Sequence, residues 1–285
     1  MTPLIDADVL LYEIGFSGEY VDDDGNPQTR EFDFVAELLD QKVKEICADV
    51  WATEEPTLYL TGSRILNRMK NKQRKREGKE PKEFQPNFRE AIATKKKYKG
   101  NRKKEKPFHF NNLIAHMLAN YNVIVAEGME ADDLMSIHQY ERIDQLDTII
   151  CSRDKDLRIT PGMHYGWECG QQRTFGPTKV EPLGVLELKG GKKIVGTGIK
   201  FFYSQLITGD TVDNIPGLPR GGPALAFKLL GDTETEEQCF KAVRQAYEDK
   251  FGDEWREQML EQGRLLWMVR ELKDNKPVMW EIPEW

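Results

Sequence analysis

Short apolar runs alternate with helix-like segments along the first 150 residues, and this alternation constrains the fold more than any other feature of the chain. The strand-like runs are 3–12, 57–62, 122–128 and 147–152. The helix-like segments, whose apolar residues recur three and four apart, are 32–50, 110–121 and about 130–142. Parallel strands need crossover segments between them, which helices usually supply. We therefore predict an α/β fold with a mainly parallel central sheet flanked by helices.

The remainder of the chain has a different pattern. Residues 183–196 predict a β-hairpin that turns at Gly190-Gly191. From about residue 199 to the end the sequence is typical of helices. We therefore place a soft boundary near residue 197, between an α/β domain at 1–197 and a helical region at 198–285.

Composition argues against several classes of protein. No run approaches the roughly 18 apolar residues of a membrane span, and the acid-bearing start "MTPLIDADVLLY" does not resemble a signal peptide. The four cysteines are far apart and form no CxxC pair, which favours a reducing compartment over a disulfide framework or a zinc site. We expect a cytoplasmic protein without a membrane partner.

Asp6, Glu130, Asp154 and Asp156 lie at or just after predicted strands, at the end of the sheet where ligands bind in α/β folds. The candidate metal ligands are Asp6, Glu130, Asp132 and Asp133 in one group, and Asp154, Asp156, Asp210 and Asp213 in another. Crowded carboxylates become favourable when a divalent ion lies between them, and Mg²⁺ prefers such oxygen ligands. Two ions can clamp the attacking and leaving oxygens of a phosphoryl displacement. For the stretch 130–133 alone, an acidic first turn that complements the helix dipole is an equal alternative.

A basic block interrupts this acidic chain. The whole chain has a net charge of −7, yet residues 64–106 contain 18 Lys or Arg against 5 Asp or Glu, a net of +13. Phosphate binding needs only one positive surface, so the block indicates a nucleic-acid partner. A solvated, disordered charge run is the simpler interpretation of residues 70–83, and flexibility does not exclude contact with DNA.

At this point the motifs carry a resemblance to a known family. They are "LIDAD", "YKGNRK" at 98–103, "EGMEADDL", "CSRDKDL" at 151–157 and "GDTVDNIPGL" at 209–218. In this order they resemble the 5′-nuclease family of phage 5′→3′ exonucleases, the nuclease domain of bacterial DNA polymerase I, and flap endonucleases. The resemblance implies a PIN-like α/β domain with a basic, arch-like insertion at about 64–106, through which a single strand passes. It also implies a helix-three-turn-helix in the C-terminal helical region.

The resemblance implies roles for individual residues as well. The eight acids above would bind two or more Mg²⁺ ions, directly or through water, and Mn²⁺ could substitute. Lys99 and Arg102 would steer the scissile phosphate and stabilise its charge. Tyr98 resembles an aromatic that stacks on a base, with core packing as the alternative, and Arg89 fits a position near the arch.

The segment 213–231 resembles the helix-three-turn-helix of the family. Gly217, Gly221 and Gly222 would let the backbone approach phosphate, where amide groups at a helix N-terminus bind anions. Arg220 is a candidate DNA contact there, because a lysine common in the family falls at about Ala224 in this chain. The family often binds a monovalent cation such as K⁺ at this place. A glycine-rich turn between two helices is the alternative.

One departure from the family concerns the strand that reads "LYLTGS". Many members have an aspartate after it, whereas this chain has Gly62. Asp8 could compensate in part, although strand alternation would aim its side chain away from that of Asp6.

The resulting expectation is a metal-dependent 5′→3′ exonuclease with 5′-flap or structure-specific endonuclease activity. Its partners would be DNA with 5′ ends or flaps and, in primer removal, RNA paired with DNA; no obligate protein partner is evident. Replication, recombination and degradation of host DNA all fit this activity, and the location would be the host cytoplasm if a phage encodes the protein. Two alternatives are a DNA-binding module of the same fold with weakened catalysis, suggested by Gly62, and a PIN-like ribonuclease.

Overall fold

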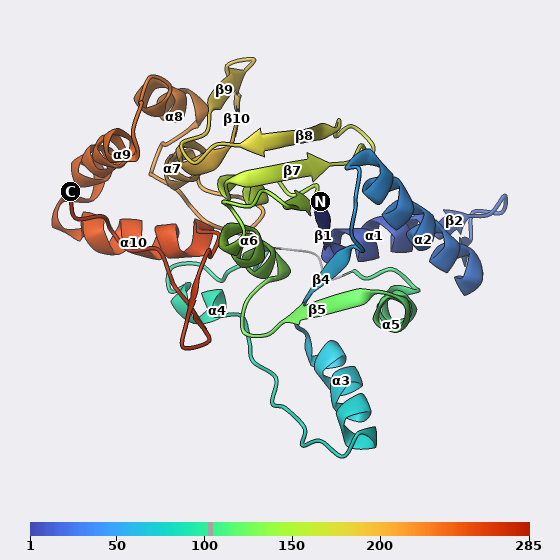
Figure 1. Cartoon of the computed structure of the whole chain (residues 1–285). Coiled ribbons are helices and arrows are strands. Elements are labelled where there is room, and N and C mark those ends of the chain that lie inside the picture. Colours follow the sequence, from blue (N-terminus) through green and yellow to red (C-terminus); the bar gives the residue numbers. More distant parts are fainter. Residues whose placement is uncertain (102–104) are drawn as a thin grey trace.

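The computed structural model describes residues 1–101 and 105–285, and it is built around a six-stranded sheet (Figure 1). The strand order is β5-β4-β1-β6-β7-β8; the first five are parallel and β8 is antiparallel to β7. The strands are β1 (Thr2–Asp6), β4 (Thr57–Thr61), β5 (Asn122–Ala126), β6 (Thr148–Cys151), β7 (Gly162–Gly166) and β8 (Phe175–Val180). The predicted α/β class with a mainly parallel sheet is confirmed.

Helices cover both faces of this sheet because each central strand is apolar on both sides. Ile5 packs in one hydrophobic cluster with helices α1 (Ala7–Ser17), α2 (Phe32–Asp49) and α5 (Phe110–Asn120). Its neighbour Leu4 belongs to a second cluster, with α6 (Ala131–Glu141) and the C-terminal helices. The period-2 alternation of a strand sends successive side chains to opposite faces, and buried parallel strands therefore read as continuous apolar runs.

The first strand is shorter than its sequence suggests. The apolar run 3–12 predicts one strand, but β1 ends at Asp6 and α1 begins at Ala7. The Asp6 side chain accepts a hydrogen bond from the Val9 amide at 3.2 Å and so caps the new helix. A buried strand and a buried helix have the same apolar content, and the cap decides between them here.

The basic block is more ordered than expected. Helix α3 (Arg64–Arg76) occupies its first part and extends away from the sheet (Figure 1). The chain then returns along this helix, where Asn67 and Asn71 each donate a side-chain hydrogen bond to the Lys82 carbonyl. It reaches a short helix, α4 (Arg89–Ile92). The interpretation of 70–83 as a disordered run is therefore wrong up to Arg76, where α3 ends.

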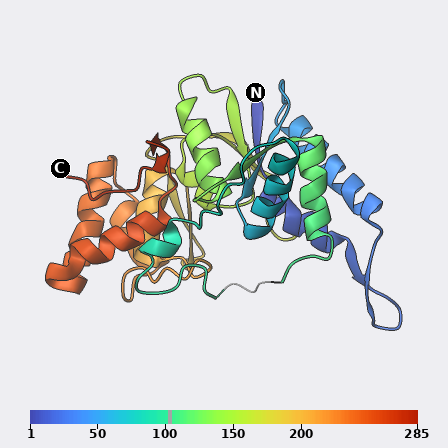
Figure 2. The same ribbon diagram turned by 90° about the horizontal axis from the view of Figure 1, so that it is seen from below.

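The C-terminal helices gather at one end of the molecule, opposite the exposed hairpin of β2 (Glu19–Val21) and β3 (Pro27–Thr29), as Figure 2 shows from below. They are α7 (Gly198–Thr208), α8 (Pro223–Leu230), α9 (Glu236–Phe251) and α10 (Trp255–Leu266). The predicted hairpin turning at Gly190-Gly191 is present as β9 (Leu186–Lys189) and β10 (Lys193–Gly196). The expectation of helices to the end is wrong beyond Leu266, where a tail with the small hairpin of β11 (Leu272–Lys273) and β12 (Lys276–Pro277) packs back on the helices.

The remaining short elements complete the chain. They are β2 (Glu19–Val21), β3 (Pro27–Thr29), β11 (Leu272–Lys273), β12 (Lys276–Pro277) and the 3₁₀ turns η1 (Asp156–Ile159) and η2 (Gly252–Glu254). The described helices include none whose length and apolar character would let it cross a membrane.

Candidate active site

Acidic side chains converge at the carboxyl edge of the sheet. The larger of two adjoining pockets, of about 710 Å³, lies over the ends of β1 and β4 and the start of α6. The smaller lies toward the turn between α7 and α8. Both are lined by Lys99, Glu130, Asp132 and Asp154, so they form one acidic cleft. The larger pocket adds Asp6 and Asp8, and the smaller adds Asp156, Asp210 and Asp213.

The acids of the cleft are buried close together, and this raises several of their pKa values. Burial and the charges of Asp8 and Asp154 raise the pKa of Asp6 to about 7, although Ser152 donates a hydrogen bond to it at 2.7 Å. Burial, with Glu130 and Asp6 nearby, raises the pKa of Asp132 well above its usual range. Carboxylates crowded in this way favour a bound cation or proton.

Two lysines pair with the acids of the cleft, and of the two only Lys99 lines its pockets. The Lys99 ammonium forms an ion pair with Glu130 and lies 3.8 Å from Asp213 Oδ2. Burial opposes ionisation of Glu130, but Lys99 and then Arg89 outweigh it and lower its pKa. Lys155 bridges the other group, at 2.8 Å from Asp156 and 3.0 Å from Asp210. The sequence interpretation assigned no role to Lys155, although its place between two acids in "RDKD" was the available signal.

Tyr98 is not placed to stack on a base. Its ring is 9% exposed and packs in the core cluster, as the alternative interpretation held. Its hydroxyl lies 2.9 Å from Glu130 and 3.0 Å from Asp213. These two carboxylates belong to different groups of the candidate metal ligands that we predicted from the sequence. A hydroxyl has one proton to donate, so it serves one of these acceptors at a time.

Asp8 faces the cleft, contrary to the expectation from strand alternation. It lies in the first turn of α1 rather than in a strand, and its carboxylate accepts a hydrogen bond from the Thr61 amide at 3.0 Å. Burial raises its pKa. Asp8 therefore joins Asp6 in the larger pocket, beside Gly62.

The side chains of Asp133 and Arg89 do not face the cleft. Both side chains are fully buried and pair with each other at 2.5 and 2.8 Å. Asp133 lines neither pocket, and its four hydrogen bonds leave it no lone pair for a metal. The expectations of metal binding by Asp133 and of DNA contact by Arg89 are therefore wrong.

The turn before α8 keeps its backbone close to that of neighbouring segments. Gly217 has φ = +70°, and a Cβ there would lie 2.3 Å from the Gly209 nitrogen. A Cβ at Gly221 would lie 2.2 Å from the Ile207 carbonyl oxygen, whereas one at Gly222 would meet no described atom within 4 Å. Arg220 is exposed, with φ = +61°. The other residue expected to steer phosphate, Arg102, lies outside the described residues.

Aromatic side chains form part of the cleft wall, and the sequence interpretation missed them. Tyr12 and Phe16 from α1 line the larger pocket with Phe110, and they are 41% and 43% exposed. The Tyr12 ring centroid lies 5.5 Å from that of Phe110. The spacing of Tyr12 and Phe16 by four residues was a signal, since it places them on one face of a helix.

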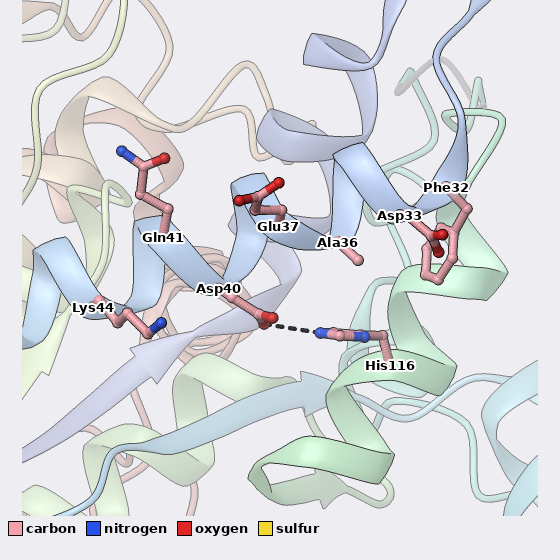
Figure 3. A pocket seen from close by; sticks show the side chains of 8 residues that line it. All are labelled: Phe32, Asp33, Ala36, Glu37, Asp40, Gln41, Lys44 and His116. Carbon is pink, nitrogen blue, oxygen red and sulfur yellow. Dashed lines mark hydrogen bonds and ion pairs between the residues drawn. The ribbon is translucent and has the colours of Figure 1, made fainter.

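A separate open hollow lies between α2 and α5, away from the acidic cleft. Figure 3 shows its lining, with the imidazole of His116 turned toward Asp40 across the gap. The His116 Nε2 and Asp40 Oδ1 atoms are 2.8 Å apart, and the Tyr121 hydroxyl also donates to Asp40. These contacts join the two helices through Asp40, and they give His116 a structural role in the hollow.

The donor chemistry of the cleft fits a divalent cation. Hard carboxylate oxygens from several elements meet there, and their burial, with repulsion from neighbouring carboxylates, raises the pKa values of Asp6 and Asp132. Among residues 1–101 and 105–285, however, no three Asp, Glu, His or Cys side chains are arranged to hold an ion directly. Mg²⁺ keeps several waters and binds through one or two carboxylates, so a hydrated ion is the form that this donor set fits.

Comparison with known proteins supports the fold. No family model matches the chain. The chain is 33% identical over 123 residues to DNA polymerase I of Rhizobium leguminosarum, which is 41% of this chain but only 11% of the polymerase. Among solved structures, a bacteriophage T5 flap endonuclease in a pseudo-enzyme-product complex with DNA and metal ions is 12% identical, with a TM-score of 0.51. The alignment covers 93% of this chain and 98% of that one.

A second structure, T5 5′-exonuclease with zinc ions bound, is 13% identical with a TM-score of 0.50, over 93% of this chain and 96% of that one. At such identities the likeness concerns the fold, and the match to DNA polymerase I adds a relationship in sequence. The chain thus has the fold of the 5′-exonuclease and flap endonuclease structures, and the resemblance to 5′-nucleases that its motifs indicate is confirmed.

Proposed function

We propose that this chain is a divalent-metal-dependent nuclease that hydrolyses DNA from 5′ ends and at 5′ flaps. The observation that carries the proposal is the acidic cleft, in which carboxylates from β1, α1, α6, the η1 region and the turn after α7 line adjoining pockets with Lys99. The T5 flap endonuclease with the same fold was solved with DNA and metal ions, which supports the same class of ligand here.

Each part of the cleft has a proposed task. The metal-holding residues would be Asp6, Asp8, Glu130, Asp132 and Asp154 on one side, and Asp156, Asp210 and Asp213 on the other. Bound there, Mg²⁺ or Mn²⁺ would supply a water of lowered pKa and neutralise charge on the phosphoryl oxygens. Lys99 carries a positive charge at the junction of the two pockets, where it is 23% exposed and can orient a phosphodiester.

DNA contacts are proposed on three surfaces around the cleft. Helix α3 supplies positive charge for the backbone, and the exposed rings of Tyr12 and Phe16 suit stacking on an unpaired base. At the turn 209–222, where Arg220 is exposed, we propose contact with a DNA phosphate and, as the resemblance implies, a K⁺ ion. We also propose RNA paired with DNA as a substrate and the cytoplasm as the location.

A cleavage assay tests the proposal. The substrates are a 5′-labelled blunt duplex, a 5′ flap, a single-stranded RNA and an RNA–DNA hybrid, each with Mg²⁺ and with EDTA. The test variant is Asp156→Asn in the cleft, and the matched control is Asp144→Asn, which removes an equal charge from an exposed site after α6. We expect Mg²⁺-dependent release of 5′ fragments from DNA by the parent and the control, and little from Asp156→Asn.

Other outcomes would identify another function. Cleavage of single-stranded RNA in preference to DNA would favour a PIN-like ribonuclease. Tight binding of the flap without cleavage in Mg²⁺ or Mn²⁺ would favour a DNA-binding module. Equal activity of both variants would contradict the assignment of Asp156 to the cleft chemistry.

A further inference from the structure

A buried ion pair joins three parts of the chain that are far apart in the sequence. Arg89 begins α4 in the basic insertion, Asp133 lies in the first turn of α6, and both are 0% exposed. The guanidinium donates to Asp133 from Nη1 at 2.5 Å and from Nη2 at 2.8 Å. Such a bidentate pair fixes orientation as well as distance.

Arg89 also donates hydrogen bonds to backbone carbonyls at the end of α10. Its Nε donates to the Leu265 carbonyl at 3.0 Å, and Nη2 donates to the Trp267 carbonyl at 2.6 Å. The last carbonyls of a helix lack partners within the helix and carry partial negative charge. A buried cation at this end of α10 therefore satisfies two backbone groups that the helix itself leaves without donors.

Asp133 also accepts hydrogen bonds from two backbone amides. Asp133 Oδ1 accepts from the Val269 amide at 3.1 Å, and Oδ2 accepts from the Glu130 amide at 3.2 Å. The bond to Glu130 forms half of a capping box at the start of α6. Asp133 thus links the backbone of one cleft acid to the segment that follows α10.

The end of α10 and the segment that follows it are part of the cleft. Leu265, Leu266 and Met268 line the smaller pocket together with Glu130 and Asp132. We infer that Arg89 and Asp133 are a positioning pair, which fixes the segment 265–269 as the apolar wall of the acidic cleft and sets the backbone of Glu130. The inference rests on the proposed function for its consequence in metal binding, but not for the geometry of the pair.

A charged pair suits this task better than an apolar contact would. Replacing a buried ion pair by apolar groups of similar volume is often neutral for stability. The stability of the fold alone therefore does not explain why a charged pair is present here. Apolar side chains, however, could not bond to the Leu265, Trp267, Val269 and Glu130 backbone groups, which would remain unsatisfied. The pair specifies one arrangement of these segments, and removing either partner leaves the other charge buried.

Hydrogen exchange of the parent protein tests the geometry. The Val269 amide lies in no helix or strand, yet its bond to buried Asp133 should protect it like the amides inside α6. The Glu130 amide should be protected in the same way. Exchange of Val269 at the rate of exposed loop amides would overturn the inference, whatever the activity of the protein.

Two variants test the consequence. Arg89→Lys keeps the charge but loses the bidentate fork, and Asp133→Asn keeps the shape but loses the charge. The control is Ile46→Ala, a fully buried position in the opposite hydrophobic cluster, which lowers stability without touching the cleft. The readouts are Mn²⁺ affinity of the DNA-free protein by electron paramagnetic resonance, exchange at Val269 and Glu130, and a thermal melt.

We expect each folded variant to bind Mn²⁺ at least 10-fold more weakly and to exchange faster at both amides, while the control matches the parent in both. Unchanged Mn²⁺ affinity and exchange in either folded variant would overturn the inference. If the parent itself binds no Mn²⁺, the proposed function fails, and the exchange data alone decide on the positioning pair. If both variants fail to fold, the exchange rates of the Val269 and Glu130 amides in the parent protein decide whether Arg89 and Asp133 are a positioning pair.

Discussion

Asp154 lines both pockets of the cleft, and its charge adds to burial in raising the pKa of Asp6, Asp132 and Asp156. We expect Asp154→Asn to lower the turnover of a 5′ flap by about 100-fold or more, equivalent to ~2.7 kcal/mol of transition-state stabilisation. The melting temperature should stay equal or rise, because a repulsive charge is removed. Steady-state cleavage and a thermal melt measure the two effects, and near-parental turnover in Mg²⁺ would contradict this role of Asp154.

Gly62 follows β4 at the edge of the cleft, and the structure explains why a side chain is absent there. Its amide donates to the Ala126 carbonyl at 2.8 Å, and a Cβ would lie 2.4 Å from that same oxygen. The substitution Gly62→Asp, which would restore the aspartate of many 5′-nucleases, therefore meets a backbone clash rather than open space beside an ion.

Substitution of Gly62 by alanine should then cost stability. We expect Gly62→Ala to lower the free energy of unfolding by about 1–3 kcal/mol, as overpacking does. The control is Gly222→Ser, where a Cβ would meet no described atom within 4 Å and serine is a good N-cap for α8. Urea unfolding of both variants is the measurement. Equal stability of Gly62→Ala and the parent would show that β4 and β5 separate easily at this end.

At the scale of elements, periodicity predicted α2, α5, β4 and β5 to within two residues, because each has one apolar pattern and a clear end. It failed at 3–12, where an apolar strand passes into an apolar helix without a turn. Asp6, Glu130 and Asp154 were predictable from their places at the ends of strands, whereas Asp210 and Asp213 follow helix α7 and were found through the motif "GDTVDNIPGL". The burial of Asp133 was not, because it depends on Arg89 and Val269, and such long-range partners leave no local pattern.

Helix α3 is the element whose charge we expect to matter most for DNA binding. Lys72, Lys75 and Arg76 are exposed, and none has an ion-pair partner within the described part of the chain. Replacing all three by glutamine should weaken DNA binding. The log–log slope of affinity against salt should flatten by about 0.9 for each duplex phosphate that the variant no longer neutralises, or by about 0.7 for a single strand. Binding titrations at several salt concentrations, in Ca²⁺ to suppress cleavage, measure this.

The control for α3 removes the same charge elsewhere. Lys241, Arg244 and Lys250 lie on α9, and their replacement by glutamine lowers the net charge equally. A salt slope that falls as much in this variant would mean that overall charge, rather than α3, governs binding. An unchanged slope in the α3 variant would show that its three side chains do not meet phosphate.

At the scale of the molecule, one hydrophobic cluster runs from the sheet into the C-terminal helices. Leu4 and Ile150 from the strands share it with Phe202 of α7 and with Trp280 of the tail. Trp280 is 5% exposed, and its ring centroid lies 5.5 Å from that of Phe202. A core that is continuous across residue 197 should unfold as a unit rather than in two steps.

Trp280→Ala tests this continuity. We expect it to destabilise the whole protein by about 3–5 kcal/mol, as the loss of a buried aromatic does. Far-UV circular dichroism, which follows all the helices, and near-UV dichroism should shift together and stay coincident. A variant in which α7–α10 melt early while the sheet persists would show that the two regions are independent.

The walls of the smaller pocket come from residues as far apart as Tyr98 and Met268, and this has a consequence for synthesis. At about 5–20 residues per second, roughly 13–52 s separate the emergence of Asp6 from that of Met268. During that interval the nascent chain carries most of its acids but lacks the wall that encloses them. A ribosome-bound or prematurely terminated chain should therefore leave nearby DNA intact, and cleavage should begin only after the segment that follows α10 has left the ribosome.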